Sequence, residues 1–217
     1  MKSIDIEIAS DVMCPWCIIG YQNLAAALDE LSNEITANIS WLPFELNPNM
    51  PIEGQAFDEH IQQKYGLTKA QSLENRARIE EMGENAGFKF NFEGERIMIN
   101  TFDCHRLLAW AKTENKQNDL SLAFFKAHFQ KGIYLNHTDA LLDIVERVGL
   151  NREKANEVLT SNAYADEVKA QIEQLKALGV NSVPTFIINQ KYGITGGQPK
   201  QAFIDNLQKI VAEPTPQ

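Results

Sequence analysis

Hydrophobic and polar residues alternate with a period of two near the N-terminus, over residues 3–9. This period is typical of a strand with one buried face. Further along, apolar residues recur at helical spacing from Ile18 to Leu31, in a segment that opens with Pro15. Proline suits the first turn of a helix, where its missing N–H costs no hydrogen bond. The first unit is therefore predicted to be a strand, a short turn and a helix.

A second strand is predicted over residues 37–46, directly after this helix. Two strands joined by a helix form a crossover unit, in which both strands run parallel. Pro43 fits poorly inside a central strand, so we expect the strand that carries it to lie at an edge or to contain a bulge.

The pattern then turns helical and stays so until Gly179, except at residues 88–99, which read as irregular or as a short hairpin. Thr68, Thr101 and Thr138 are the predicted N-caps. Helices are predicted at Phe57–Tyr65, Thr68–Ala86, Thr101–Lys112, Asp119–Lys131, Asp139–Val148, Arg152–Thr160 and Ala163–Leu178.

The C-terminal part is predicted to be a hairpin followed by a helix. Residues 183–188 read as a strand and residues 192–195 as its antiparallel partner. Pro199 opens a last helix, and the end of the chain from Glu213 is expected to be loose. The whole order predicts an α/β fold with a mixed four-stranded sheet and a large all-helical insertion. We place the boundaries at 1–50 with 178–213 for the sheet domain, and at 51–177 for the insertion.

Charge and hydropathy narrow the function classes. The net charge is −9, and no run of Lys and Arg of the kind that binds nucleic acid is present. No window is long and apolar enough to predict a membrane span. The N-terminus lacks the basic start and unbroken apolar stretch of a secretory signal, so a cytoplasmic location is expected.

The three cysteines are Cys14, Cys17 and Cys104, too few for a secreted disulfide framework. Cys14-Pro15-Trp16-Cys17 lies where the first helix is predicted to begin. There a Cys14 thiolate would meet unpaired backbone N–H groups and the positive end of the helix dipole, which lower a thiol pKa. Cys17 lies one turn further in, within reach of Cys14, so the pair fits thiol–disulfide exchange.

Two other interpretations of the pair compete with redox chemistry. A structural zinc site needs about four ligands, and no second cysteine pair is present, so no metal is predicted. Two inert buried cysteines are the other alternative, because cysteine is commonly buried. A C-x-x-C motif beside a strand–helix–strand pattern favours redox chemistry over both.

The step from Val183 to Pro184 is the second candidate feature. A cis proline there would leave the Val183 backbone free to pair with an extended substrate. Taken alone, a trans proline at the start of a strand is the commoner reading, and only the cysteine pair reverses that judgement. Substrate-binding roles are predicted for Val183 and Ser182, together with Pro15 and Trp16, whose ring offers a flat apolar surface beside Cys14.

Candidate accessory residues are Asp11, Cys104 and His105. Asp11 fits either a turn-forming role or a proton acceptor for Cys17. Cys104 fits either a third redox thiol or a small apolar residue on a helix face. His105 fits either the lining of the active-site groove or a helix-surface role.

Four blocks of the sequence together resemble the FrnE-like branch of the DsbA family. They are Ser10–Gly20, Asn100–Leu107, Gly179–Phe186 and Gly196–Gln198. The resemblance implies a thioredoxin fold with a helical insertion, Cys14 as nucleophile, Cys17 as resolving cysteine and Pro184 as a cis proline. One departure stands out, because Cys104 occupies a position where relatives usually carry a small apolar residue.

These observations predict a thiol–disulfide oxidoreductase or isomerase that acts on protein or small-molecule disulfides, with glutathione as a candidate co-substrate. The alternative is a glutathione-dependent isomerase or transferase, similar to 2-hydroxychromene-2-carboxylate isomerase and the kappa-class transferases. Those enzymes typically carry a lone Ser or Cys where this chain has Cys14 and Cys17. A third hypothesis is a chaperone-like protein that uses the helical insertion as its surface, and the insertion is also a candidate homodimer face.

Overall fold

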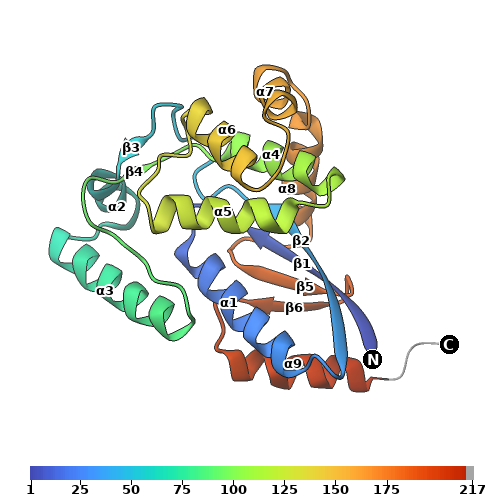
Figure 1. Ribbon diagram of the computed structural model, residues 1–217. Coiled ribbons are helices and arrows are strands. Elements are labelled where there is room, and N and C mark those ends of the chain that lie inside the picture. Colours follow the sequence, from blue (N-terminus) through green and yellow to red (C-terminus); the bar gives the residue numbers. More distant parts are fainter. Residues whose placement is uncertain (214–217) are drawn as a thin grey trace.

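The computed structural model describes residues 1–213, and a mixed four-stranded sheet with strand order β2-β1-β5-β6 lies at its centre (Figure 1). The strands are β1 (Lys2–Ser10), β2 (Ile35–Pro43), β5 (Thr185–Ile188) and β6 (Tyr192–Thr195). β1 runs parallel to β2 and antiparallel to β5, which is antiparallel to β6. The predicted fold class is therefore confirmed. β2 forms an edge of the sheet and ends at Pro43, which removes the conflict between proline and a central strand.

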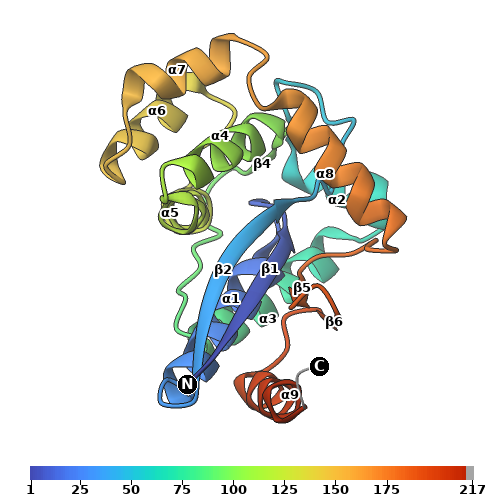
Figure 2. The ribbon, with the colours of Figure 1, turned by 90° about the vertical axis from the view of Figure 1, so that its right-hand side faces the viewer.

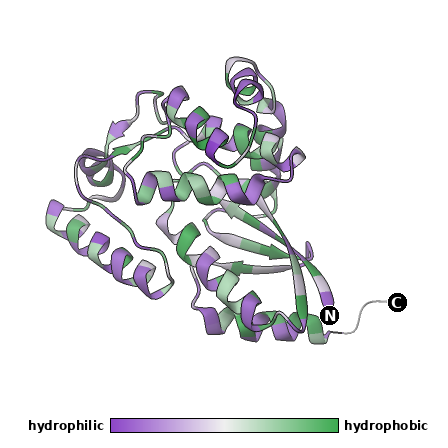
Figure 3. Cartoon of the chain, viewed as in Figure 1, coloured by the Kyte–Doolittle hydropathy of each residue, from purple (hydrophilic) through white to green (hydrophobic). Residues whose placement is uncertain are grey.

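The alternation along β1 separates a buried face from an exposed one. Ile4, Ile6 and Ile8 pack into one core with apolar residues of α1 (Pro15–Glu30) and α9 (Lys200–Ala212). Ser3 and Asp5, which point the other way, are exposed. In Figure 3, hydrophobic green segments lie along the strands and at the start of α1, whereas α2 is largely hydrophilic.

The segment between β2 and β5 is mostly helical. Its helices are α2 (Phe57–Tyr65), α3 (Lys69–Asn85), α4 (Phe102–Thr113), α5 (Gln117–Phe129), α6 (Thr138–Arg147), α7 (Arg152–Thr160) and α8 (Ala165–Ala177). Figure 2 shows α4 to α8 gathered at one end of the sheet, with α9 at the other. Of the two readings of residues 88–99, the irregular one agrees with the structure and the hairpin does not. β4 (Ile97–Met98) pairs instead with β3 (Gln55–Ala56), which precedes α2 and α3 in the chain.

The three predicted threonine caps have different outcomes. Thr68 caps α3 through a capping box, in which its hydroxyl and the Gln71 side chain satisfy each other's backbone N–H groups. Thr101 occupies the N-cap position of α4, but the Asn100 amide oxygen accepts the hydrogen bond from the first N–H of the helix. Thr138 is the first residue of α6 and makes no cap. The latter two predictions of a threonine cap are therefore wrong.

The helical segment shares its core with the sheet. Phe88, Phe90, Phe125 and Phe129 pack with the sheet and α1, although they belong to the segment between β2 and β5. Conversely, the loop before α1 contributes Val12 and Met13 to the core formed by α4 to α7. The loop that carries the cysteine pair is consequently held between both cores. The division at residues 50 and 178 stays a prediction.

Candidate active site

Cys14 is the N-cap residue of α1, and Pro15 occupies the first helical position, as predicted. The backbone N–H of Cys14 donates to the Asp11 carbonyl at 2.9 Å, and the Cys14 carbonyl accepts from Cys17 at 3.1 Å. The Cys14 side chain makes no capping hydrogen bond with the first turn. Its thiol lies 3.7 Å from the Val183 carbonyl oxygen and donates to it. The side chain therefore faces the Val183 carbonyl, whereas the sequence predicted that it would meet the N–H groups of the first turn.

Cys17 lies behind Cys14 and is completely buried, with an exposed fraction of 0% against 4% for Cys14. Burial raises the pKa of the Cys17 thiol well above its ordinary value, and a hydrogen bond and the charge of Cys14 add to this effect. The Ser10 hydroxyl and the Asp11 backbone act in the opposite direction. Both cysteines are free thiols. The two sulfurs differ in burial, and the raised pKa keeps Cys17 a neutral thiol beside Cys14.

The Val183–Pro184 peptide bond is cis, as the family resemblance implied. The segment is fixed on both sides, because the Thr185 hydroxyl donates to the Ser182 carbonyl at 2.9 Å and the Gly196 N–H donates to the Pro184 carbonyl at 2.8 Å. These contacts hold the Val183 carbonyl next to the thiol of the first cysteine.

The Gly196–Gln198 block packs against the helix that carries the cysteine pair. A Cβ atom on Gly197 would lie 3.1 Å from the Trp16 carbonyl oxygen, and one on Gly20 would lie 3.2 Å from the Gly197 Cα. The Asn23 amide donates to the Gln198 carbonyl at 2.9 Å. Glycine at both positions lets this loop approach the first turns of α1.

A cavity of about 380 Å³ opens beside Cys14, between the cysteine loop and helices α2, α3 and α5. Three of the four predicted substrate-binding residues line it, namely Pro15, Trp16 and Val183. The fourth, Ser182, lines a different hollow next to β6. Most of the wall is apolar. The structure thus brings the nucleophile candidate, three predicted binding residues and a ligand-sized space together.

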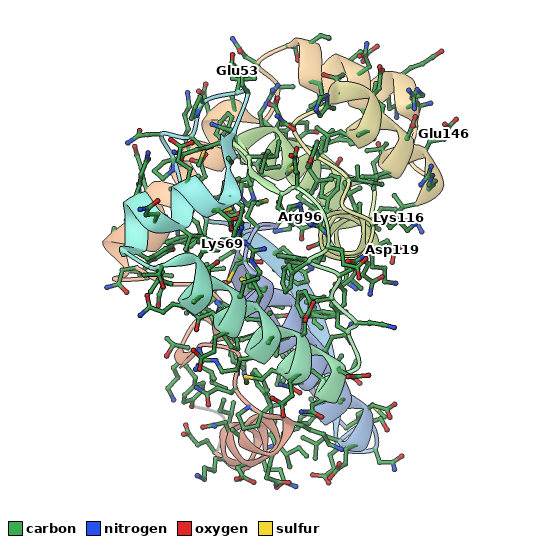
Figure 4. All side chains as sticks on the ribbon, turned by 90° about the vertical axis from the view of Figure 1, so that its left-hand side faces the viewer. Glu53, Lys69, Arg96, Lys116, Asp119 and Glu146 are labelled. Atoms are coloured by element: carbon green, nitrogen blue, oxygen red, sulfur yellow. The ribbon has the colours of Figure 1, made fainter. Side chains whose placement is uncertain are left out.

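Sequence reasoning missed the polar residues of this cavity. Arg76, Arg78 and Arg96 line it, together with His128. Figure 4 shows Arg96 between α3 and α5. One sequence signal was available on α3, because Ser72, Arg76 and Ile79 at spacings of four and three line the cavity from one face of the helix.

Asp11 fixes the loop that leads into the cysteine pair. Its carboxylate accepts hydrogen bonds from the backbone N–H of Met13 at 3.2 Å and of Leu46 at 2.7 Å, and it also bonds the Thr101 side chain. Burial raises the pKa of Asp11, and the nearby His105 opposes that rise. The bond to Met13 is an Asx-turn, which is the turn-forming role considered for this residue. A role of Asp11 in accepting the proton of the second cysteine stays a prediction.

Cys104 and His105 lie on α4, outside the residues that line the cavity. Cys104 is fully buried, and its thiol donates to the Leu135 carbonyl at 3.7 Å. Burial raises the pKa of Cys104 well above its ordinary value, and the negative charges of Asp11 and Asp103 raise it further. His105 contacts the Phe44 carbonyl at 3.0 Å, and burial lowers its pKa. The accessory roles predicted for both residues stay predictions.

Residues 1–213 contain neither a cluster of metal-ligating side chains nor a membrane-spanning helix. No three His, Cys, Asp or Glu side chains gather in an arrangement that could hold a metal ion. Within the same range, none of the helices combines the length and the hydrophobicity that crossing a bilayer requires.

Comparison with known proteins connects these features to a family. Residues 5–208 match the DSBA-like thioredoxin domain. A probable DsbA oxidoreductase from Streptomyces coelicolor superposes with a TM-score of 0.92 at 29% identity, covering 99% of this chain and 92% of that one. Two more distant structures share the fold. A 2-hydroxychromene-2-carboxylate isomerase gives a TM-score of 0.70 at 14% identity, with coverages of 95% and 96%. The cytosolic disulfide reductase DsbM from Pseudomonas aeruginosa, solved with GSH, gives 0.63 at 15% identity, with coverages of 96% and 100%.

The FrnE-like assignment, the cytoplasmic location and the homodimer stay predictions. The predicted oxidoreductase activity agrees with the family and with the relative from Streptomyces coelicolor. With the matched region extending over nearly the whole length, this chain belongs to the family of DSBA-like thioredoxin domains and is an oxidoreductase.

Proposed function

We propose that the protein exchanges thiols and disulfides through Cys14-Pro15-Trp16-Cys17, with Cys14 attacking and Cys17 resolving. The observation that carries this assignment is the asymmetry of the pair. Cys14 lines the cavity, whereas Cys17 is completely buried and burial raises its pKa. A substrate disulfide therefore reaches Cys14 first, and Cys17 reacts only in the second step, with the mixed disulfide.

The reaction proceeds in two steps, formation of a mixed disulfide and its resolution. The Cys14 thiolate attacks one sulfur of a substrate disulfide, a bond forms between the two sulfurs, and the substrate disulfide breaks to release one thiolate, which takes up a proton. Cys17 then loses its proton and attacks the Cys14 sulfur, which breaks the mixed disulfide and releases the second substrate thiol. The substrate is reduced, and the protein holds a disulfide between Cys14 and Cys17. Two molecules of a thiol co-substrate, with glutathione as our candidate, restore the dithiol: the first forms a mixed disulfide with Cys14 and frees Cys17, and the second displaces Cys14, so that both leave as one glutathione disulfide.

The Val183 backbone supports a position for the substrate. Its carbonyl lies next to the Cys14 sulfur, and both residues line the cavity. A backbone edge at this place suits a substrate with an extended, peptide-like part. DsbM, which shares this fold, is a cytosolic disulfide reductase whose structure contains GSH. This likeness supports a small thiol partner and a cytoplasmic location for this chain.

The glutathione-dependent isomerase or transferase remains the second candidate, since such an isomerase shares the fold. It requires one nucleophile and gives the second thiol no role. The placement of Cys17 directly behind Cys14 favours exchange chemistry.

The test is reduction of insulin disulfides with dithiothreitol as electron donor. Cys14→Ser is expected to lose at least about a hundredfold in rate, because the attacking sulfur is absent. Cys104→Ala removes a buried thiol that lies outside the cavity and leaves the pair intact, so retained activity would assign the exchange to the pair, whereas lost activity would assign the accessory role to Cys104. Cys17→Ala is expected to accumulate mixed disulfides on Cys14. Unchanged turnover in Cys14→Ser would contradict the proposal, and conjugation of glutathione that survives Cys17→Ala would support the second candidate.

A further inference from the structure

The cavity beside Cys14 combines apolar walls with an excess of positive charge. Arg76, Arg78 and Arg96 line it, and among the residues that the structure describes its wall has no Asp or Glu. This concentration of arginine is unexpected in a chain whose net charge is −9. A localised positive potential in a cleft attracts anions and raises their local concentration.

Two of these arginines lack a carboxylate partner within residues 1–213. Arg96 donates to the His128 carbonyl at 2.9 Å and to the Asn91 carbonyl, so its hydrogen-bond partners are neutral, and the nearby Arg76 adds a second positive charge. Arg78 is exposed, makes no hydrogen bond or salt bridge, and lies 5.9 Å from the centre of the Trp16 ring. Arg76 alone is paired, with Asp58. The positive charge in the cavity is therefore largely uncompensated.

The buried polar atoms without partners gather at the same place. Of the six such side-chain atoms in residues 1–213, four belong to residues that line the cavity, namely Ser72 Oγ, Arg76 Nε, Arg96 Nε and His128 Nδ1. Ser72 and His128 are each 5% exposed. Buried polar groups in proteins nearly always have a hydrogen-bond partner, so these atoms leave hydrogen-bonding capacity at the wall of the cavity for a polar ligand group.

We infer that this cavity selects a small organic disulfide or thiol with an apolar body and an anionic group, such as a carboxylate or sulfonate. The anionic group lies against Arg78 and Arg96, the apolar body lies against the walls, and the sulfur reaches Cys14. The volume of about 380 Å³ suits a small molecule, since ligand sites span about 300–1,000 Å³. The inference rests on the proposed function and adds the substrate class.

The first test compares two aromatic disulfides of similar size that report the reaction by colour. 5,5′-Dithiobis(2-nitrobenzoate) carries carboxylates, whereas 4,4′-dithiodipyridine is uncharged. Reduced protein is mixed with each reagent, and the rate constants of Arg78→Gln and Arg96→Gln are divided by those of the wild type. We expect the rate with the carboxylate reagent to fall about tenfold and the rate with the uncharged reagent to change less than about twofold.

Lys69→Gln is the matched control. It removes the same charge from the first turn of α3, but Lys69 does not line the cavity, and we expect neither rate to change by more than about twofold (Figure 4). Arg78 has no hydrogen bond to lose, so its variant is expected to keep the wild-type melting temperature even if Arg96→Gln is destabilised. Equal slowing with both reagents, or no slowing with the carboxylate reagent, would overturn the inference.

The second test measures binding without exchange, in the Cys14→Ser variant. The probes are 8-anilinonaphthalene-1-sulfonate and N-phenyl-1-naphthylamine, which share a ring system and differ by the sulfonate. Adding Arg78→Gln is expected to weaken sulfonate binding about tenfold and to leave the uncharged probe unchanged. If neither coloured disulfide reacts at Cys14, the proposed function fails, while the binding result still decides the anion preference. Equal affinities of the sulfonate with and without Arg78 would reject that preference.

Discussion

The sulfur of Cys14 lies 3.7 Å from the carbonyl oxygen of Val183, although 169 positions separate them in the chain. The sheet explains the proximity. Ala9 of β1 pairs with Thr185 of β5, so the residues that follow Ala9 and those that precede Thr185 leave the sheet at the same end. The cysteine loop and the Val183 segment therefore meet at the same end of the sheet, next to the cavity.

The accessibility of the three thiols predicts their order of alkylation. Cys14 lines the cavity, whereas Cys17 and Cys104 are completely buried and burial raises the pKa of both. We expect iodoacetamide to modify Cys14 at least about tenfold faster than the other two, because the thiolate is the reactive form. Peptide mass mapping of briefly treated native protein measures this order. In guanidinium chloride the three rates should converge, and equal native modification of Cys104 would contradict the prediction.

The raised pKa of Cys17 predicts a pH dependence of the second step of exchange. Only its thiolate attacks the mixed disulfide on Cys14, and burial, the main cause of the raised pKa, persists in that intermediate. Release of the second thiol should therefore accelerate about tenfold per pH unit between pH 6 and 9. Stopped-flow absorbance with 5,5′-dithiobis(2-nitrobenzoate) follows this release.

Ser10→Ala offers a check on the same step. The Ser10 hydroxyl favours the Cys17 thiolate, so its removal should slow the second step and leave the first, at Cys14, unchanged. A second step that is independent of pH over this range would show that Cys17 is not resolving through a thiol of raised pKa.

The close approach of Gly20 to the Gly197 loop predicts a stability effect. A Cβ atom on Gly20 would lie 3.0 Å from a ring carbon of Phe186 and 3.2 Å from the Gly197 Cα, and the latter atom belongs to the backbone. Gly20→Ala should therefore lower the free energy of unfolding by about 1–3 kcal/mol through overpacking. Urea denaturation measures the change. Gly193→Ala is the control, since a Cβ there meets nothing within 4 Å, and an equal loss in both variants would contradict the argument.

Local signals in the sequence account for the elements that were predicted well. The period of two along β1, proline at the first position of α1 and the capping box of Thr68 each act over a few neighbouring residues. The Thr101 cap failed for a tertiary reason. Its side chain bonds Asp11, which comes from the loop before α1, and Asn100 takes over the cap. No local pattern contains that contact.

The position of the cavity could not be predicted from the sequence, also for a tertiary reason. Arg76 and Arg78 lie on α3, Arg96 precedes β4, and His128 lies at the end of α5, so the fold alone brings them to one wall. The cysteine pair could be predicted because its spacing and its helix start are adjacent in the chain. A binding surface assembled from separate helices has no such signature in a single sequence.

The burial of His128 predicts a loss of stability in acid. Burial, with a further contribution from the charge of Arg96, lowers the pKa of His128 from 6.5 to about 4. The unfolded chain binds a proton there below about pH 6.5, whereas the folded chain stays neutral until about pH 4. Protons therefore favour the unfolded state across this window, and stability is lost as the pH falls. Between pH 7 and 5 the loss from this one group should be about 2 kcal/mol.

His128→Gln isolates this effect, because its side chain cannot be protonated. The difference in free energy of unfolding between wild type and variant, measured by urea denaturation at pH 7, 6 and 5, should shift in favour of the variant as the pH falls. Other titrating groups act in both proteins and cancel in that difference. His137→Gln is the matched control, because it removes an exposed imidazole and leaves the buried one in place. A difference that stays constant from pH 7 to 5 would mean that His128 binds its proton equally well in the folded and unfolded chains, and the buried, cationic surroundings described for it would then be wrong.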